Sequence, residues 1–172
     1  MLFVIYVRGG SEISVMEQLR RKGYAAYCPR RMCDERRRGE WQTTERIIFT
    51  GYLFIDAEVI TAEDWHRIAS CDGFIKFVSM TALSPTEDEY IRALCADGEC
   101  IGVSRGYIKC GALHITEGFA KKFEHKIVKF NRRGRRATAD ITICGQHRKV
   151  IFSVIFDDPP ASGDTLPDSE KI

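Results

Sequence analysis

Short apolar runs and helical patterns alternate over the first hundred residues. Leu2–Val7 is apolar throughout, which predicts a buried strand. Apolar residues then recur at helical spacing after Ser11, a residue type that caps helix N-termini, and Gly23 is placed to end that helix. The chain therefore opens with a strand followed by an amphipathic helix.

Two further strands are expected at Tyr24–Arg31 and Glu45–Ile55, with the charged segment Arg36–Glu40 between them as a hairpin tip. The alternation within Phe49–Phe54 requires one face of its strand to be buried. The arginines of the tip have acidic neighbours, so a solvated turn is the default interpretation.

Two helix starts are marked by capping residues. Thr61 with Asp64 three positions later fits a capping box, and Ser84-Pro85 with Glu87 is a sharper start because proline suits the first helical position. Phe74–Ser79 lies between them as a strand. The expected order β-α-β-β-β-α-β-α predicts an α+β sandwich with a largely antiparallel sheet.

The pattern changes after the third helix. Residues 98–107 lack periodicity and are interpreted as a linker between a first domain, 1–97, and a second, 108–156. The second domain contains short β segments separated by turn residues, which predicts a small β-barrel. Residues 157–172 are acidic and rich in Pro and Ser, which is typical of a disordered tail. The expected strands are Leu113–Ile115, Lys126–Phe130, Thr138–Ile143 and Val150–Phe156.

Charge is distributed unevenly. The whole chain carries a formal charge of +2, but residues 99–156 contain 12 Lys/Arg and four Asp/Glu, a net charge of +8. Eight of these cations fall within 16 residues that contain one acid, Glu124. Such density favours a phosphate-bearing partner over a merely solubilising surface, and RNA is read largely through its backbone and shape. The predicted RNA-binding residues are Lys121, Lys122, Lys126, Lys129, Arg132, Arg133, Arg135 and Arg136.

Composition argues against several other classes of protein. No apolar run is long enough to span a membrane and no secretory signal is evident, so a cytoplasmic protein is expected. Seven cysteines without a C-x-x-C motif suggest free thiols rather than a zinc site. The four histidines have no catalytic partner spacing, and no phosphate-cradling loop is present. We therefore expect neither an enzyme nor a bound cofactor.

Several segments taken in order resemble the NusG family. The opening strand, the charged hairpin and the run Phe49–Ile55 resemble the NusG N-terminal (NGN) domain, although Thr50 stands where the family usually has proline. Thr116 to Gly145 resembles a KOW domain, with His125 at a position that is usually glycine. The resemblance covers residues 1–156 and implies a two-domain transcription factor.

This resemblance implies particular partners. An apolar pocket of the NGN domain would grip a coiled coil of the RNA polymerase clamp, and Tyr6, Phe49, Tyr52 and Phe54 match the pocket region. From the residues alone, sheet core is the favoured interpretation, because alternating aromatics usually pack inward; the resemblance makes Tyr52 and Phe54 the better candidates for the pocket. Arg8 matches a basic position with which specialised paralogues contact non-template DNA, and a monomer is expected.

Within the family, the segment Gly118–Glu124 and the basic run Lys126–Ala137 look more like the specialised LoaP-type antiterminators than like housekeeping NusG. Ala120 stands where housekeeping NusG has a phenylalanine that helps to bind Rho or a ribosomal protein, and losing a large apolar anchor argues against those partners. The resemblance thus implies antitermination directed by a leader hairpin in the nascent RNA. A general NusG elongation and termination factor, and a ribosome-associated RNA-binding module, are the alternatives.

Overall fold

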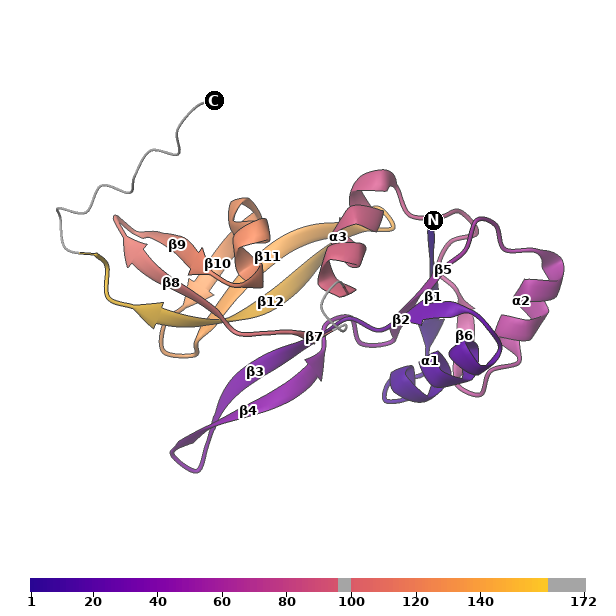
Figure 1. The fold of residues 1–172 in the computed structure, drawn as a ribbon, viewed down its shortest axis with the longest axis horizontal. Helices are drawn as coiled ribbons and strands as arrows, with labels where there is room; N and C mark the ends of the chain where they lie inside the picture. The colour runs from indigo at the N-terminus through magenta and orange to yellow at the C-terminus, as the bar shows by residue number, and fades with distance from the viewer. Residues whose placement is uncertain (96–99, 161–172) are drawn as a thin grey trace.

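The computed structural model describes residues 1–95 and 100–160, and Figure 1 shows its course. The elements of the N-terminal part are β1 (Leu2–Val7), α1 (Glu12–Arg21), β2 (Ala25–Tyr27), β3 (Arg30–Arg37), β4 (Glu40–Ile47), β5 (Tyr52–Asp56), α2 (Ala62–Ala69), β6 (Phe74–Phe77) and α3 (Pro85–Cys95). Those of the C-terminal part are β7 (Cys100–Ile101), β8 (Ser104–Lys109), β9 (Ala112–Glu117), the 3-10 helix η1 (Phe119–Lys126), β10 (Ile127–Asn131), β11 (Arg136–Ile143) and β12 (Gln146–Asp157).

The N-terminal sheet has the strand order β2-β5-β1-β6, and each of its pairings is antiparallel. Side chains at alternate positions of its strands pack into two different hydrophobic cores. Ile5 and Leu53 pack with residues of α1 and α2, whereas Val4 and Phe54 belong to a second cluster on the opposite face. This confirms the predicted α+β class, and it leaves one face of the sheet for contacts other than α1 and α2.

Local capping signals correctly locate the helix starts. Thr61 and Asp64 form a capping box at α2, because the Thr61 hydroxyl accepts from the Asp64 N–H at 3.1 Å and Asp64 accepts from the Thr61 N–H at 3.0 Å. Ser84 and Glu87 form the corresponding contacts at α3. Ser11 occupies the cap position of α1 but makes no capping bond, since its hydroxyl accepts from Arg8 instead.

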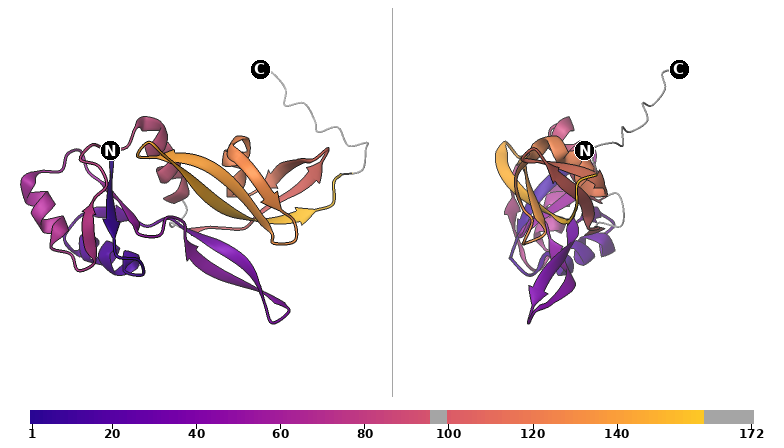
Figure 2. Two further views of the ribbon diagram at one scale, coloured as in Figure 1. Left: turned by 180° about the vertical axis from the view of Figure 1, so that it is seen from behind. Right: turned by 90° about the vertical axis from the view of Figure 1, so that its left-hand side faces the viewer.

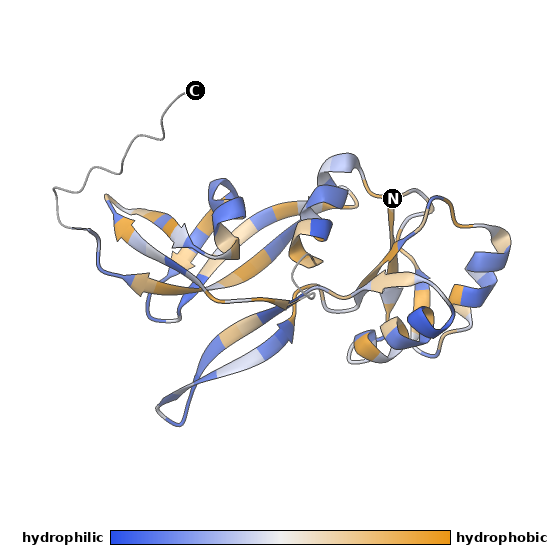
Figure 3. Ribbon diagram, viewed as in Figure 1, coloured by the Kyte–Doolittle hydropathy of each residue, from blue (hydrophilic) through white to orange (hydrophobic). Residues whose placement is uncertain are grey.

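Two of the expected strands are each divided. Tyr24–Arg31 is split into β2 and the start of β3, and Glu45–Ile55 is split into the end of β4 and β5. The second break is at Gly51, whose φ of +82° places it in the left-handed region that glycine readily adopts. The β3–β4 hairpin is consequently a long, mostly hydrophilic arm that extends away from the first sheet (Figures 1 and 3).

The C-terminal part is a five-stranded sheet in the order β10-β11-β12-β8-β9. β12 pairs with β11 over its first two thirds and then with β8 in parallel, so one long strand joins two partners. η1 packs against β8, β9 and β11. The expected barrel is therefore a curved sheet with β10 and β9 at its edges, which Figure 2 shows from behind.

The expected linker is structured where it is described. Residues 104–107 form the first part of β8, and Cys100–Ile101 pairs in parallel with the start of β3. Residues 96–99 and 161–172 lie outside the described residues, and so do positions 98–99 of the expected linker and most of the expected acidic tail. Asp157, placed by expectation at the start of that tail, ends β12.

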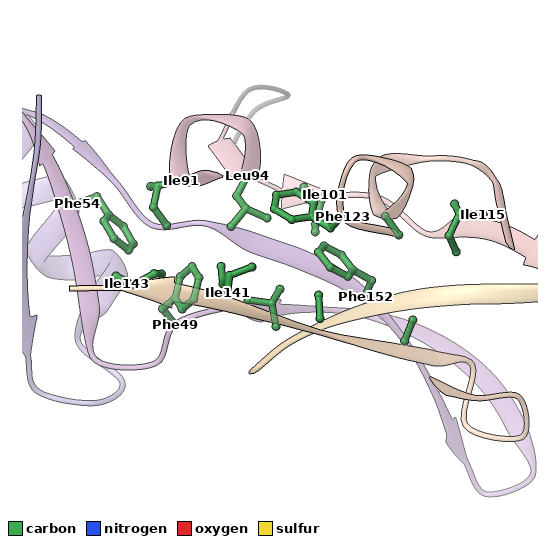
Figure 4. Close-up of a cluster of buried hydrophobic side chains, with 14 of the residues drawn as sticks. Phe49, Phe54, Ile91, Leu94, Ile101, Ile115, Phe123, Ile141, Ile143 and Phe152 are labelled. Carbon is green, nitrogen blue, oxygen red and sulfur yellow. The ribbon is translucent and has the colours of Figure 1, made fainter. Parts of the chain in front are cut away.

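One apolar cluster runs through both parts of the chain. It joins Phe54 and Leu94 from the N-terminal part to Phe123, Ile141 and other residues of the C-terminal sheet (Figure 4). A hydrogen bond also joins the two parts, since the Ser153 hydroxyl in β12 donates to the Met32 carbonyl in β3 at 2.8 Å. The two parts are thus docked on one another in this structure.

Candidate functional site

A pocket of about 750 Å³ lies on the sheet face that α1 and α2 leave uncovered. The four aromatic residues predicted for the polymerase contact all line it. Tyr6 and Tyr52 are opposite one another in the β1–β5 register, with ring centroids 5.2 Å apart, and both are half-buried. Phe49 and Phe54 are in edge-to-face contact at 5.7 Å and are buried. The structure therefore brings the four together, with the tyrosines as the accessible pair and the phenylalanines as core.

Gly51 fixes the position of Tyr6. A Cβ atom at residue 51 would lie 2.7 Å from Cε2 of the Tyr6 ring, so the ring packs directly on the glycine backbone. The Gly51 N–H donates to Oε1 of the buried Glu12 at 2.8 Å, which holds this backbone in place. The pocket wall is thus preformed by a turn that accepts glycine and little else.

The tip of the β11–β12 hairpin forms another wall of the same pocket. The Gly145 N–H donates to Oε1 of Glu87 at 3.2 Å, and Nη2 of Arg148 donates to the Tyr52 hydroxyl at 2.7 Å. The Arg148 guanidinium also lies 4.9 Å from the centroid of the Tyr52 ring, within the range of a cation–π contact. The hairpin tip is a two-residue turn, with both Cys144 and Gly145 at positive φ.

Glu87 connects this tip to the start of α3. Burial raises the pKa of Glu87, but hydrogen bonds from Ser84 and from the backbone N–H groups of Gly145 and Cys144 outweigh it, so the pKa lies below its ordinary value. The ionised carboxylate is consequently the form that holds the tip in place.

The eight predicted RNA-binding residues are spread along β10 and beyond both of its ends. Three belong to η1, Lys129 lies within β10, and the other four belong to the β10–β11 turn and the first position of β11. The length of β10 separates the two end groups by about 13 Å at 3.3 Å per residue. Six of the eight are exposed, while Lys126 and Arg135 are half-buried. The exposed residues are Lys121, Lys122, Lys129, Arg132, Arg133 and Arg136.

The two half-buried cations contact the N-terminal part of the chain. Nζ of Lys126 lies 5.9 Å from the Tyr90 ring centroid in α3. Arg135 pairs with Asp34 at 3.1 Å, and its guanidinium carbon lies 4.0 Å from the centroid of the Trp41 ring in the β3–β4 hairpin. These two residues therefore help to dock the C-terminal part in addition to carrying charge.

Comparison with known proteins gives the family. Residues 2–95, more than half of the chain, match the family model described as "Transcription termination factor nusG". The chain belongs to the NusG family. Its fold is similar to a solved structure titled "Domain interaction in Thermotoga maritima NusG", with a TM-score of 0.51 and 17% sequence identity over 88% of this chain and 92% of that one. No curated protein matches the sequence. The NusG family comprises transcription factors that act on RNA polymerase rather than enzymes.

Arg8 lies outside the aromatic pocket of this NusG-family chain. It is exposed at the end of β1, where Nη2 is 3.4 Å from Asp72 and Nε donates to the Ser11 hydroxyl at 3.3 Å. Because both members of the ion pair are well exposed, the pair contributes little stability and leaves Arg8 free to exchange partners.

The structure modifies two inferences drawn from the family resemblance. Ala120 is fully buried within η1, so its small size fits the core and says nothing by itself about Rho or a ribosomal protein. His125 does not have a positive φ, so replacing the family's usual glycine at this position causes no backbone strain. The argument against general NusG partners is accordingly weaker than the sequence suggested.

Two contributors to these surfaces were not predicted from the sequence. Arg148 contacts Tyr52, which lies 96 positions earlier in the chain, and Trp41 contacts Arg135, which lies 94 positions later. No local periodicity in the sequence indicates pairs so far apart. Trp41, an aromatic residue isolated among charges near a hairpin tip, was the one available signal.

The described part of the chain contains no cluster of metal ligands, no disulfide and no membrane-spanning helix. No three His, Cys, Asp or Glu side chains there are grouped so that they could hold a metal ion. None of the seven cysteines, all of which the structure describes, forms a disulfide, and Cys110 is exposed at a turn. Among residues 1–95 and 100–160 no helix has the length and apolar character needed to cross a bilayer.

Proposed function

We propose that this NusG-family chain is a specialised transcription antitermination factor. Its NGN domain would bind the clamp coiled coil of RNA polymerase through Tyr6, Phe49, Tyr52 and Phe54, and its C-terminal β domain, as a KOW domain, would bind a leader hairpin of the nascent RNA. The observation that carries the proposal is the separation of the two surfaces. An aromatic pocket lies at one end of β11, and exposed cations extend along β10 and the turn at its other end.

The polymerase contact requires the β11–β12 tip to move. An α-helix with its side chains is about 10–12 Å across, so a pocket of about 750 Å³ that the tip already narrows is too small for a coiled coil. The docked chain is then a resting form from which the tip withdraws. The related Thermotoga maritima NusG structure is described as one of domain interaction, which is consistent with such a form.

The RNA contact is supported by charge and exposure. Six of the eight cations of the set are exposed, and among the described residues Lys121, Lys129, Arg133 and Arg136 have no acidic partner. Lys/Arg side chains spread over about 13 Å suit phosphates on an RNA helix better than they suit base edges. Two tethered contacts, with polymerase and with RNA, would then reinforce one another through effective concentration.

Smaller parts of the proposal follow from single residues or from the family. Arg8, held by an exposed pair with Asp72 and an exposed hydrogen bond to Ser11, would contact non-template DNA once polymerase is bound. The factor would act as a monomer in the cytoplasm and would need no cofactor.

Terminator readthrough tests the proposal. Transcription with purified polymerase on templates with and without a 5′ leader hairpin should give higher readthrough only when both the hairpin and this factor are present. Equal readthrough on the two templates would refute recruitment by RNA.

A general NusG elongation and termination factor is the second candidate. Two observations favour it: the matching family model is that of a transcription termination factor, and the burial of Ala120 removes the main objection to general NusG partners. Pull-down of Rho or of a ribosomal protein by the full chain would support this alternative, and their absence would support the specialised role.

A further inference from the structure

A cationic cleft lies between the two domains, at the end of β11 opposite the aromatic pocket. It has a volume of about 420 Å³ and is bounded by the β3–β4 hairpin on one side and the β10–β11 turn on the other. Its lining residues are Asp34, Glu35, Arg36, Arg37, Trp41, Arg133, Gly134 and Arg136.

The acids of this cleft are already neutralised. Glu35 pairs with Arg37 at 3.3 Å and with Arg46 at 3.1 Å, and Asp34 pairs with Arg135 at 3.1 Å. The hydrogen bond from Arg46, followed by the one from Arg37, lowers the pKa of Glu35 and outweighs the opposite effect of burial. This acid therefore stays ionised. The positive charges that remain therefore come from other residues.

Three arginines of the cleft have no acidic partner within residues 1–95 and 100–160: Arg36, Arg133 and Arg136. Arg36 donates to the Gly39 carbonyl at 3.0 Å, which orients it without neutralising it. Burial lowers the pKa of nearby Arg31, and repulsion from Arg136 acts in the same direction. An anion between the two domains would relieve this excess of positive charge.

Trp41 adds an aromatic surface to the cleft. The residue is 39% exposed, although the Arg135 guanidinium lies 4.0 Å from its ring centroid. An exposed indole beside unpaired arginines is the combination with which proteins hold single-stranded nucleic acid, because every base can stack and every phosphate is anionic.

We propose that this cleft binds a single-stranded segment of RNA, with one base stacked on Trp41 and its phosphates on Arg36, Arg133 and Arg136. The inference rests on the proposed RNA binding, and it adds the β3–β4 hairpin of the NGN domain to the RNA-binding surface. The eight residues of β11 place the cleft about 23 Å from the β11–β12 tip at 3.3 Å per residue, so a bound strand lies outside the polymerase pocket.

Fluorescence of Trp41 tests the inference in the full-length chain. The chain has two tryptophans, and Trp65→Phe leaves Trp41 as the sole reporter. Titration with an unstructured oligouridylate of about 12 nucleotides, labelled for anisotropy, should quench Trp41 as the RNA binds. In the matched Trp41→Phe chain, which keeps Trp65, binding should produce no quenching. A glutamate peptide of equal charge should not quench Trp41; equal quenching by it would overturn the assignment to RNA.

Affinity measurements separate stacking from charge. Trp41→Leu should weaken oligouridylate binding about tenfold, the value of one stacked base, whereas Trp41→Phe should retain most of it. Arg133→Ala with Arg136→Ala should reduce the slope of log K against log salt by about 1.4, at about 0.7 per phosphate. Arg21→Ala, which removes an exposed cation at the end of α1, is the control and should change the slope little.

The outcomes distinguish this inference from the proposed function. Quenching together with a Trp41-dependent affinity supports the cleft. Binding by anisotropy with no change in Trp41 fluorescence would overturn the cleft while leaving RNA binding elsewhere on the C-terminal domain intact. Failure of every RNA to bind, hairpins included, would overturn the proposed function and the cleft together.

Discussion

The contact between Arg148 and Tyr52 predicts that a single substitution outside the NGN domain strengthens polymerase binding. Arg148 belongs to β12, but its guanidinium donates to the Tyr52 hydroxyl at 2.7 Å and lies over the Tyr52 ring at 4.9 Å. Arg148→Ala removes both interactions and leaves the aromatic residues of the pocket unchanged. The docked arrangement should therefore weaken while the polymerase site remains intact.

The size of this effect follows from the contacts. A hydrogen bond that involves a charged group contributes about 1.5–3 kcal/mol, and a half-exposed cation–π contact adds about 0.5–1 kcal/mol. Partial exposure of Arg148 reduces the sum, so we take about 1.4 kcal/mol, or a tenfold change in the docking equilibrium. Because the apparent dissociation constant is the intrinsic one divided by the open fraction, the apparent Kd for polymerase should fall about tenfold.

The assay is equilibrium binding of the labelled full-length chain to purified RNA polymerase, with Lys149→Ala as the matched control. Lys149 is the next residue on the same strand, carries the same charge, and pairs with Asp140 of the neighbouring strand instead of with the pocket. The control should bind as the unmodified chain does. If Arg148→Ala binds polymerase no more tightly than Lys149→Ala, the tip does not restrict the pocket and the reasoning fails.

Three further predictions follow from single positions. Gly51→Ala should destabilise the chain by about 1–3 kcal/mol, because its φ is +82° and the new Cβ would meet the Tyr6 ring at 2.7 Å; an unchanged melting temperature would disprove the packing. The docked form should lose stability in acid. After Ser84, the Gly145 and Cys144 N–H groups of the tip lower the pKa of Glu87, and opening removes these two bonds. The open form then binds more protons, so docking holds above the ordinary carboxyl pKa and weakens as the pH falls through the lowered one. Energy transfer between labels on the two domains should report this loss of docking. In Glu87→Gln the part of the acid transition that Glu87 causes should be absent. An identical acid transition in that variant would contradict the assignment to Glu87. Cys110→Asn should raise stability by up to about 1 kcal/mol in thermal unfolding, since asparagine tolerates the φ of +52° at this exposed turn better than cysteine, and a lower melting temperature would count against that interpretation.

Features set by neighbouring residues could be predicted from the sequence. The Thr61–Asp64 and Ser84–Glu87 boxes were located correctly, because each depends on residues three positions apart. The break at Gly51 was not, since the apolar run continues across it and only a positive φ marks the turn.

Features set by distant residues could not be predicted. Ser104–Lys109 lacks an apolar pattern and is a strand because β9 and β12 pair with it on both sides. The second use of Arg135, as a docking residue on Trp41, depends equally on two segments that meet only in the folded chain. The sequence indicated which residues carry charge and which are aromatic, but not which of them the docked domains place together.

Salt-dependent binding of a leader-type hairpin RNA to the full-length chain tests the central claim most directly. Contact of four of the eight basic residues with phosphates predicts a slope of log K against log salt of about −3.6, at about −0.9 per contact. A slope near that value, reduced when the exposed set is replaced by glutamine, is the expected result. A salt-independent affinity, or unchanged binding after the replacement, would contradict the account.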